Sequence, residues 1–405
     1  MVSVGVVALG ASLYVFLAIS AHHMTPSDFA ALSVLYVLSN TSGPGLFLPL
    51  EQEIARLVTV RRHAGEPAGS VLSAAGRVTG AACVVLIGSV VVAEQPLSRA
   101  LFGGDRLLVL WLCVSIVGYA ATYVSRGLYA GRGEYARFGG QIAIEGGFRL
   151  IFSLLVVAAG WSSLNSLAFV FVAAPLVAVT LTRGTRPKEP HGPPLPWTQL
   201  SASLGWLVVC SACSQLVANA GPVIIAVMAR AEDKDEVGRF LAALVLVRVP
   251  LFLFSATQAA LVPTLAKLSA EGSAPFASAV RRLVLVLVGS GVLVVGAVAA
   301  VGRRSLEVLF GARYSIPTAD LTMLAAGSVV LLAANVAGQA LIASGAHARA
   351  ATGWLCALPG VALGAALGAS LIARAELALL LGAVAAFAAH VINLGVGFRR
   401  PARPA

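Results

Sequence analysis

The sequence predicts an all-helical membrane protein that crosses the bilayer many times. Hydrophobic residues make up 59% of the chain and charged residues 11%, whereas soluble domains have an apolar content nearer half and about a quarter of charged residues. The mean hydropathy is +0.91. Apolar runs of about 20 residues, each long enough to cross a hydrocarbon core about 30 Å thick, recur along the chain. These observations exclude a soluble enzyme or binding domain.

About twelve apolar runs are predicted to form membrane-spanning helices. In chain order they cover 2–20, 29–50, 72–93, 106–125, 140–160, 166–182, 200–229, 238–262, 283–301, 317–343, 351–372 and 377–397. The first run is too long for the apolar part of a typical cleavable signal, so we expect it to remain as a span. The seventh and tenth runs are long, and we expect them to tilt or to begin outside the hydrocarbon core.

Basic residues in the loops predict the orientation of the chain. One alternating set of loops contains Arg61, Arg126, Arg183 and Arg282, and it holds about twice as many lysines and arginines as the opposite set. The positive-inside rule places the base-rich loops in the cytoplasm, so both termini are expected there. Because the bases lie between spans, the net charge of +11 does not indicate a nucleic-acid partner.

A proline-rich stretch divides the chain near its middle. The segment "GTRPKEPHGPPLPW" (184–197) contains five prolines, which favour a semi-rigid extended spacer over a helix. We therefore predict an N-terminal six-helix bundle over 1–183, a cytoplasmic linker over 184–199 and a C-terminal six-helix bundle over 200–405.

Short sequence matches indicate that the two halves are repeats. "ALFGGDR" (100–106) and "VLFGARY" (308–314) share a Leu-Phe-Gly step that follows an apolar run in each half. A Pro-x7-Gln pattern also occurs in the second run of each half, at Pro44 with Gln52 and at Pro250 with Gln258. Since each half has six spans, both copies start on the same side of the membrane. The repeat is therefore predicted to be parallel, as in transporters built from two equivalent bundles.

Longer stretches carry a resemblance to a known family. They are "PSDFAALSVLYVL" (26–38), "RGLYAGRGEYARFGGQIAIEGGFRL" (126–150) and "VGRFLAALVLVRVPLFL" (237–253). With these patterns the chain resembles the multidrug/oligosaccharidyl-lipid/polysaccharide (MOP) flippase superfamily and, within it, the polysaccharide-biosynthesis (Wzx-type) branch. The chain departs from that branch in being short, with twelve predicted spans where fourteen are usual.

The resemblance implies a fold and a function. The fold would be a MATE-like pair of six-helix bundles around a V-shaped central cavity, working by alternating access. The substrate would be a lipid-linked oligosaccharide or polysaccharide precursor, moved from the cytoplasmic to the outer leaflet of a bacterial inner membrane. Glycosyltransferases and a glycan polymerase of the same pathway are the expected partners.

Two arginines are predicted at mid-membrane depth, one in each half. A charge there costs about 2.5–3.5 kcal/mol on insertion scales, so Arg149 and Arg248 need a partner or a wet cavity. Both guanidinium groups suit a pyrophosphate or an acidic sugar, because their forked donors bind oxygen atoms bidentately. For Arg149 the alternative is a structural pair with Glu145, which lies one helical turn earlier in the favourable i,i+4 order. Glu145 is also a candidate for the same cavity.

Several polar residues and prolines are further candidates for a transport pathway. Gln52, Gln258, Asn219 and Gln339 are predicted either to line a sugar-binding cavity or to form hydrogen bonds between helices. Pro44 and Pro250 are predicted to bend their helices and so to assist gating. Glu51, at the predicted inner end of the second span, is either a solvated helix end or a gate.

Other functions stay open at this stage. A cation-coupled multidrug exporter of the same fold is the main alternative, although the first, seventh and tenth runs contain no central Asp or Glu. A membrane-embedded glycosyltransferase would need a loop site such as His22, His23 and Asp28, and a non-transporting scaffold is a further alternative. No G-x-x-x-x-G-K-[ST] loop is present. We predict a non-enzyme with no cofactor and no metal site.

Overall fold

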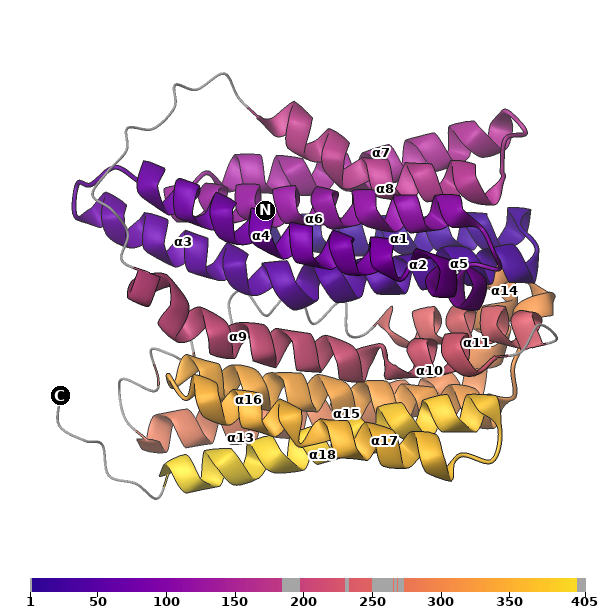
Figure 1. Cartoon of the computed structure of the whole chain (residues 1–405). Helices are drawn as coiled ribbons and strands as arrows, with labels where there is room; N and C mark the ends of the chain where they lie inside the picture. Colours follow the sequence, from indigo (N-terminus) through magenta and orange to yellow (C-terminus); the bar gives the residue numbers. More distant parts are fainter. Residues whose placement is uncertain are drawn as a thin grey trace. The chain divides into compact units, whose positions relative to one another are not determined.

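The computed structural model describes residues 2–183, 197–229, 233–249, 265, 268 and 273–398, and all the regular secondary structure in these residues is helical. The chain divides into two compact units, Met1–Ala212 and Cys213–Ala405. Figure 1 shows the helices of each unit lying lengthwise beside one another. Most of the predicted linker, together with Pro250 and Gln258, lies outside the described residues.

Unit 1 contains the helices that precede the linker. They are α1 (Val2–His23), α2 (Pro26–Ser42), the π-helical segment η1 (Gly43–Phe47), α3 (Leu48–His63), α4 (Gly69–Val92), α5 (Glu94–Leu101), α6 (Arg106–Arg132), α7 (Tyr135–Ala158) and α8 (Leu164–Thr182). The division between the units falls within α9 (Trp197–Ala218).

Unit 2 contains the remaining described helices. They are α10 (Ala220–Met228), α11 (Lys234–Val247), α13 (Ser273–Ala297), the π-helical segment η3 (Val298–Gly302), α14 (Arg303–Phe310), the short 3₁₀ segment η4 (Ala312–Tyr314), α15 (Thr318–Ala343), α16 (His347–Leu355), α17 (Ala357–Leu367) and α18 (Leu371–Phe398).

Every predicted run coincides with a helix where the chain is described. Nine helices among the described residues are long and apolar enough to cross a membrane, and shorter apolar helices cover Ala8–His23 and Leu204–Ala218. The predicted eighth run, 238–262, begins in α11 and then passes beyond the described residues. The all-helical, multi-pass fold is therefore confirmed.

Several helix ends differ from the predicted ones, and two of the differences concern candidate site residues. The helix predicted over 29–50 continues through η1 and α3 to His63, which gives 38 residues or about 57 Å at 1.5 Å per residue. The helix predicted over 106–125 continues to Arg132, so Arg126 lies within α6 and not in a loop. In both cases a polar segment extends an apolar helix, and hydropathy alone does not detect such an extension.

In the described part of the chain, α4 and α5, α9 and α10, and α16 and α17 are separated by single residues, Ala93, Asn219 and Cys356. Each break lies three residues before a proline, namely Pro96, Pro222 and Pro359. Proline has no backbone N–H and cannot bond the carbonyl four residues earlier. That carbonyl belongs to the last residue of the helix before each break, so proline chemistry accounts for all three positions.

The two units repeat much of their internal packing. In unit 1, α6 packs against α3, α4 and α8, and α7 packs against α8; in unit 2, α15 packs against α11, α13 and α18, and α17 packs against α18. When the spans of each half are numbered from one to six, the fourth packs against the second, third and sixth in both units. The fifth packs against the sixth in both units. The first helix differs, because α1 packs against α7 whereas α10 packs against α18.

The two Leu-Phe-Gly steps also occupy equivalent places. Each one ends an eight-residue helix, α5 or α14, that follows the third predicted span of its half. Phe102 and Phe310 are each 2% exposed. The shared Leu-Phe-Gly motif therefore places a buried aromatic residue at the same point of each repeat.

Candidate functional site

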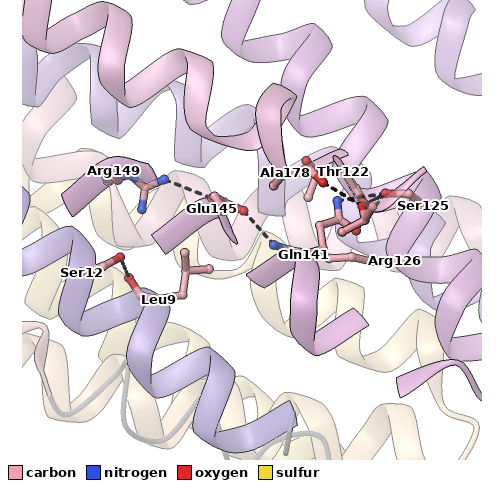
Figure 2. Close-up of polar contacts among 10 residues, drawn as sticks. Leu9, Ser12, Thr122, Ser125, Arg126, Gln141, Glu145, Arg149 and Ala178 are labelled. Atoms are coloured by element: carbon pink, nitrogen blue, oxygen red, sulfur yellow. Dashed lines mark hydrogen bonds and ion pairs between the residues drawn. The ribbon is translucent and has the colours of Figure 1, made fainter. Parts of the chain in front are cut away.

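A buried charge cluster lies between α6 and α7 of unit 1. The Arg126 Nη2 donates to Glu145 Oε2 at 2.8 Å, and the Arg149 Nη2 donates to Glu145 Oε1 at 3.0 Å. Glu145 is 3% exposed and Arg149 2% exposed. Figure 2 shows the Glu145 carboxylate joined to both arginines. One carboxylate thus serves two guanidinium groups, and the cluster carries a net charge of +1.

Aromatic rings cover the two guanidinium groups. The Arg149 guanidinium carbon lies 5.4 Å from the centroid of the Phe171 ring on α8, and that of Arg126 lies 6.0 Å from the Phe138 ring. Both distances are within the range of a cation–π contact. The rings stabilise the positive charge without consuming N–H donors, so they leave the forked donors available for oxygen atoms.

Polar side chains extend the cluster along α6 and α7. Gln141 Nε2 donates to Ser125 Oγ at 3.0 Å (Figure 2). Gln141 lies one turn before Glu145 on α7, and Ser125 directly precedes Arg126 on α6. On the other side, α1 packs closely, because a Cβ placed at Gly146 would lie 3.0 Å from Ser12 Oγ. The charges are therefore enclosed by α1, α6, α7 and α8 rather than exposed to lipid.

The cluster has donors to spare. A guanidinium group has five N–H donors, and the buried Nε atoms of Arg126 and Arg149 form no hydrogen bond within the described part of the chain. Glu145 balances the charge of only one of the two guanidinium groups, and a buried charge without a counter-ion is costly in a membrane interior. The arrangement is chemically suited to accept a second anionic group in addition to Glu145.

The predicted Arg149–Glu145 pair therefore exists, but Arg126 was missed. The sequence places Arg126 among loop bases, because the apolar run ends near residue 125. The available signal is Gly133, which adopts a left-handed conformation and caps α6 immediately after Arg132. A helix stop at that glycine places Arg126 two turns inside the helix.

Arg248, the corresponding arginine of unit 2, has neutral oxygen atoms as its described partners. It follows the end of α11, and its Nη1 donates to Asn219 Oδ1 at 3.1 Å. Its Nη2 donates to the carbonyl oxygen of Ala218. Asn219 is buried and its Nδ2 donates to Gln215 Oε1 at 3.2 Å. Arg248 thus joins the α9–α10 break to the end of α11.

The other predicted residues are dispersed. Gln52 is exposed on α3, and Gln339 is half-buried on α15. Pro44 lies in η1, where its carbonyl oxygen accepts a hydrogen bond from Ser211 Oγ at 2.8 Å. Glu51 is half-buried inside α3, so its placement at a helix end was wrong.

The loop that could have supported an enzyme has a local structural role. Thr25 is the N-cap of α2, and its hydroxyl oxygen accepts from the Asp28 backbone N–H at 3.2 Å. The Thr25 hydroxyl also donates to Asp28 Oδ2 at 2.9 Å. His22 Nδ1 contacts the Ala18 carbonyl oxygen at 2.8 Å. Among the described residues, no group of three His, Cys, Asp or Glu side chains is arranged to hold a metal ion.

Comparison with other sequences finds distant relatives without assigned functions. No protein-family model matches the chain. Uncharacterized proteins of Mycobacterium bovis and Mycobacterium tuberculosis are 24% and 25% identical over 394 residues, covering 94% of this chain and 88% of each relative.

Comparison with solved structures identifies the fold. An inward-facing multidrug resistance MATE family transporter of the MOP superfamily superposes with a TM-score of 0.71 at 14% identity, covering 95% of this chain and 93% of that one. A MATE structure in the bent conformation gives 0.68 at 14% identity, with coverage of 98% and 93%. A Vibrio cholerae MATE transporter gives 0.65 at 16%, with coverage of 98% and 94%. This chain is therefore a multi-pass membrane protein with the fold of the MATE transporters of the MOP superfamily.

Proposed function

We propose that this protein is a flippase that moves a lipid-linked oligosaccharide or polysaccharide precursor from the cytoplasmic to the outer leaflet. The observation that carries the proposal is the Arg126–Glu145–Arg149 cluster, which has a net positive charge and unused donors inside a transporter fold. A lipid-linked sugar carries its negative charge on the phosphate or pyrophosphate that joins sugar to lipid. Guanidinium groups bind phosphate oxygens bidentately.

In this proposal, Glu145 is the resident counter-ion of the cluster. It holds both guanidinium groups in place, and a phosphate group provides the second negative charge that the cluster lacks. Alternating access, as in other transporters built from two bundles, then exposes the bound headgroup to one side of the membrane at a time. The proposed setting is a bacterial inner membrane with both termini cytoplasmic, beside the glycosyltransferases and polymerase that make and use the glycan.

Reconstitution in liposomes tests this function. A fluorescent polyprenyl diphosphate oligosaccharide is incorporated, and the fraction exposed in the outer leaflet is followed with a glycosidase that cannot cross the membrane. Arg149→Lys keeps the charge but loses the fork of donors, so we expect flipping to slow about tenfold, equivalent to one charge-assisted hydrogen bond. Arg303→Lys, in an exposed pair of unit 2, is the matched control and should leave the rate unchanged.

One observation favours a second function, cation-coupled drug export. Glu376 on α18 is 3% exposed, and its Oε1 has no hydrogen-bond partner among the described residues. A buried carboxyl of this kind is suited to bind a proton or a cation. The test uses the same liposomes with a pH gradient and cationic dyes. The drug-export function replaces the first proposal if three results are obtained together: the gradient drives dye efflux, Glu376→Gln abolishes this efflux, and lipid-linked sugars are not flipped.

A further inference from the structure

The break between α9 and α10 leaves one main-chain carbonyl without its helical donor. Asn219 alone interrupts the helix, and Pro222 has no N–H to donate to the carbonyl of Ala218. The bonds on either side are intact: Asn219 N donates to Gln215 O at 2.9 Å, and Val223 N donates to Asn219 O at 3.1 Å. Pro222 therefore removes the helical donor of the Ala218 carbonyl.

Arg248 supplies the missing donor. Its Nη2 donates to the Ala218 carbonyl oxygen, and its Nη1 donates to the Asn219 side-chain oxygen at 3.1 Å. Both bonds come from one planar guanidinium group, which a lysine ammonium group cannot reproduce. Because an unsatisfied carbonyl costs several kcal/mol in a membrane interior, the arginine at this place compensates for the proline.

The other two proline breaks follow residues with exposed side chains. Val92, before the break that Pro96 causes, is 88% exposed, and Leu355, before the break that Pro359 causes, is 43% exposed. The break at Asn219 is the buried one of the three, and it is the one that an arginine bridges.

We propose that Arg248 is a positioning residue that replaces the backbone N–H absent at Pro222 and fixes the broken helix α9–α10 against the end of α11. The guanidinium group acts through the helix break and not through contact with substrate. This role differs from the substrate contact expected from the sequence, and it does not depend on which substrate is carried.

A double-mutant cycle tests the proposal with purified protein in detergent. Arg248→Ala leaves the Ala218 carbonyl without a donor, and we expect the melting temperature to fall by about 5 °C. Pro222→Ala restores an N–H at the correct position of the helix. In the Pro222→Ala background, Arg248→Ala should therefore lower the melting temperature by less than half as much. Pro359→Ala is the matched control, and it should not reduce the effect of Arg248→Ala.

Transport by the same variants separates positioning from substrate binding. Whichever substrate the liposome assays identify, Arg248→Ala should slow transport and the double variant with Pro222→Ala should recover most of the rate. Arg248→Lys keeps a charged donor group but not the planar fork, so it should lie between wild type and Arg248→Ala in both measurements. It replaces Arg248→Ala if the alanine variant does not fold. Equal losses of melting temperature in both backgrounds overturn the proposal. Restored stability with transport still lost also overturns it, because that result assigns Arg248 to the substrate.

Discussion

The two predicted mid-membrane arginines, Arg149 in unit 1 and Arg248 in unit 2, have different surroundings. Arg149 forms an ion pair with Glu145, which also binds Arg126. The described bonds of Arg248 go to a main-chain carbonyl and an amide oxygen beside a helix break. The sequence places both residues in equivalent halves at similar depth, yet the oxygen atoms described as their partners differ in kind.

The difference shows how a duplicated fold diverges. Helix pairs and the buried Phe of the Leu-Phe-Gly step recur in both units, because they build the core that each bundle needs. Charged side chains in the membrane interior are held by whatever oxygen atoms lie nearby, and these differ between the copies. Among the described residues, a carboxylate that binds two buried arginines is found in unit 1, and the phosphate site that we propose lies there.

The largest expected effect is at the shared carboxylate. Glu145→Gln leaves two buried guanidinium groups without a negative partner, and we expect it to reduce the free energy of unfolding by about 3–5 kcal/mol. The measurement is the melting temperature and the yield of monodisperse protein from membranes. Glu145→Asp, which keeps the charge on a shorter side chain, should be intermediate.

Glu307→Gln is the matched control in unit 2. Glu307 pairs with Arg303 with the same four-residue spacing, at 3.1 Å, but on an exposed surface. Solvent already screens this pair, so its loss should leave the melting temperature unchanged. Equal effects of the two Glu→Gln changes would contradict the view that the unit 1 cluster is buried and tightly coupled.

The repeated aromatic anchors should give a smaller and nearly equal effect in the two units. Phe102→Ala and Phe310→Ala each remove a buried ring, and we expect each to cost about 3 kcal/mol of unfolding free energy. Chemical denaturation of the purified protein measures it. Leu309→Ala is the control, since Leu309 precedes Phe310 but is exposed. If one Phe variant leaves the unfolding free energy unchanged while the other unfolds the protein, the two Leu-Phe-Gly motifs are not structurally equivalent.

The positions of the helices could be predicted because apolar runs of membrane length leave the chain little choice. The breaks at Ala93, Asn219 and Cys356 could also have been predicted, because each lies three residues before a proline. The bond between Arg248 and Ala218 could not be predicted. It joins residues 30 positions apart and depends on how α11 packs beside the break.

The charge cluster was predictable in part for a related reason. Glu145 and Arg149 lie on one helix with i,i+4 spacing, which the helix period alone brings together. Arg126 lies on another helix, and hydropathy assigns it to a loop. Residues on one element can thus be paired from sequence, whereas pairs between elements need both the helix end and the packing.

The smallest expected effects are at glycines where helices cross, and they compare the two units directly. In unit 1, a Cβ at Gly131 on α6 would lie 2.6 Å from the Val58 Cβ and 2.8 Å from the Ala55 carbonyl oxygen on α3. In unit 2, a Cβ at Gly364 on α17 would meet the Leu377 main chain on α18. We expect Gly131→Ala and Gly364→Ala each to cost about 1–3 kcal/mol, measured as a loss of melting temperature. Gly364→Ala should cost more, because a main chain yields less than a side chain.

Glycines with open space are the controls for this last comparison. Gly147 on α7 and Gly289 on α13 have no atom within 4 Å of the position that a Cβ would take. Alanine there removes the helix penalty of glycine, so each variant should gain up to about 1 kcal/mol in unfolding free energy. We expect the change in unfolding free energy to be a loss at the glycines where helices cross and a gain at the open glycines, in both units. This result would show that helix contacts, and not helix propensity, determine the effect of each Gly→Ala change. A gain at Gly364→Ala would mean that α17 and α18 lie further apart than the structure places them.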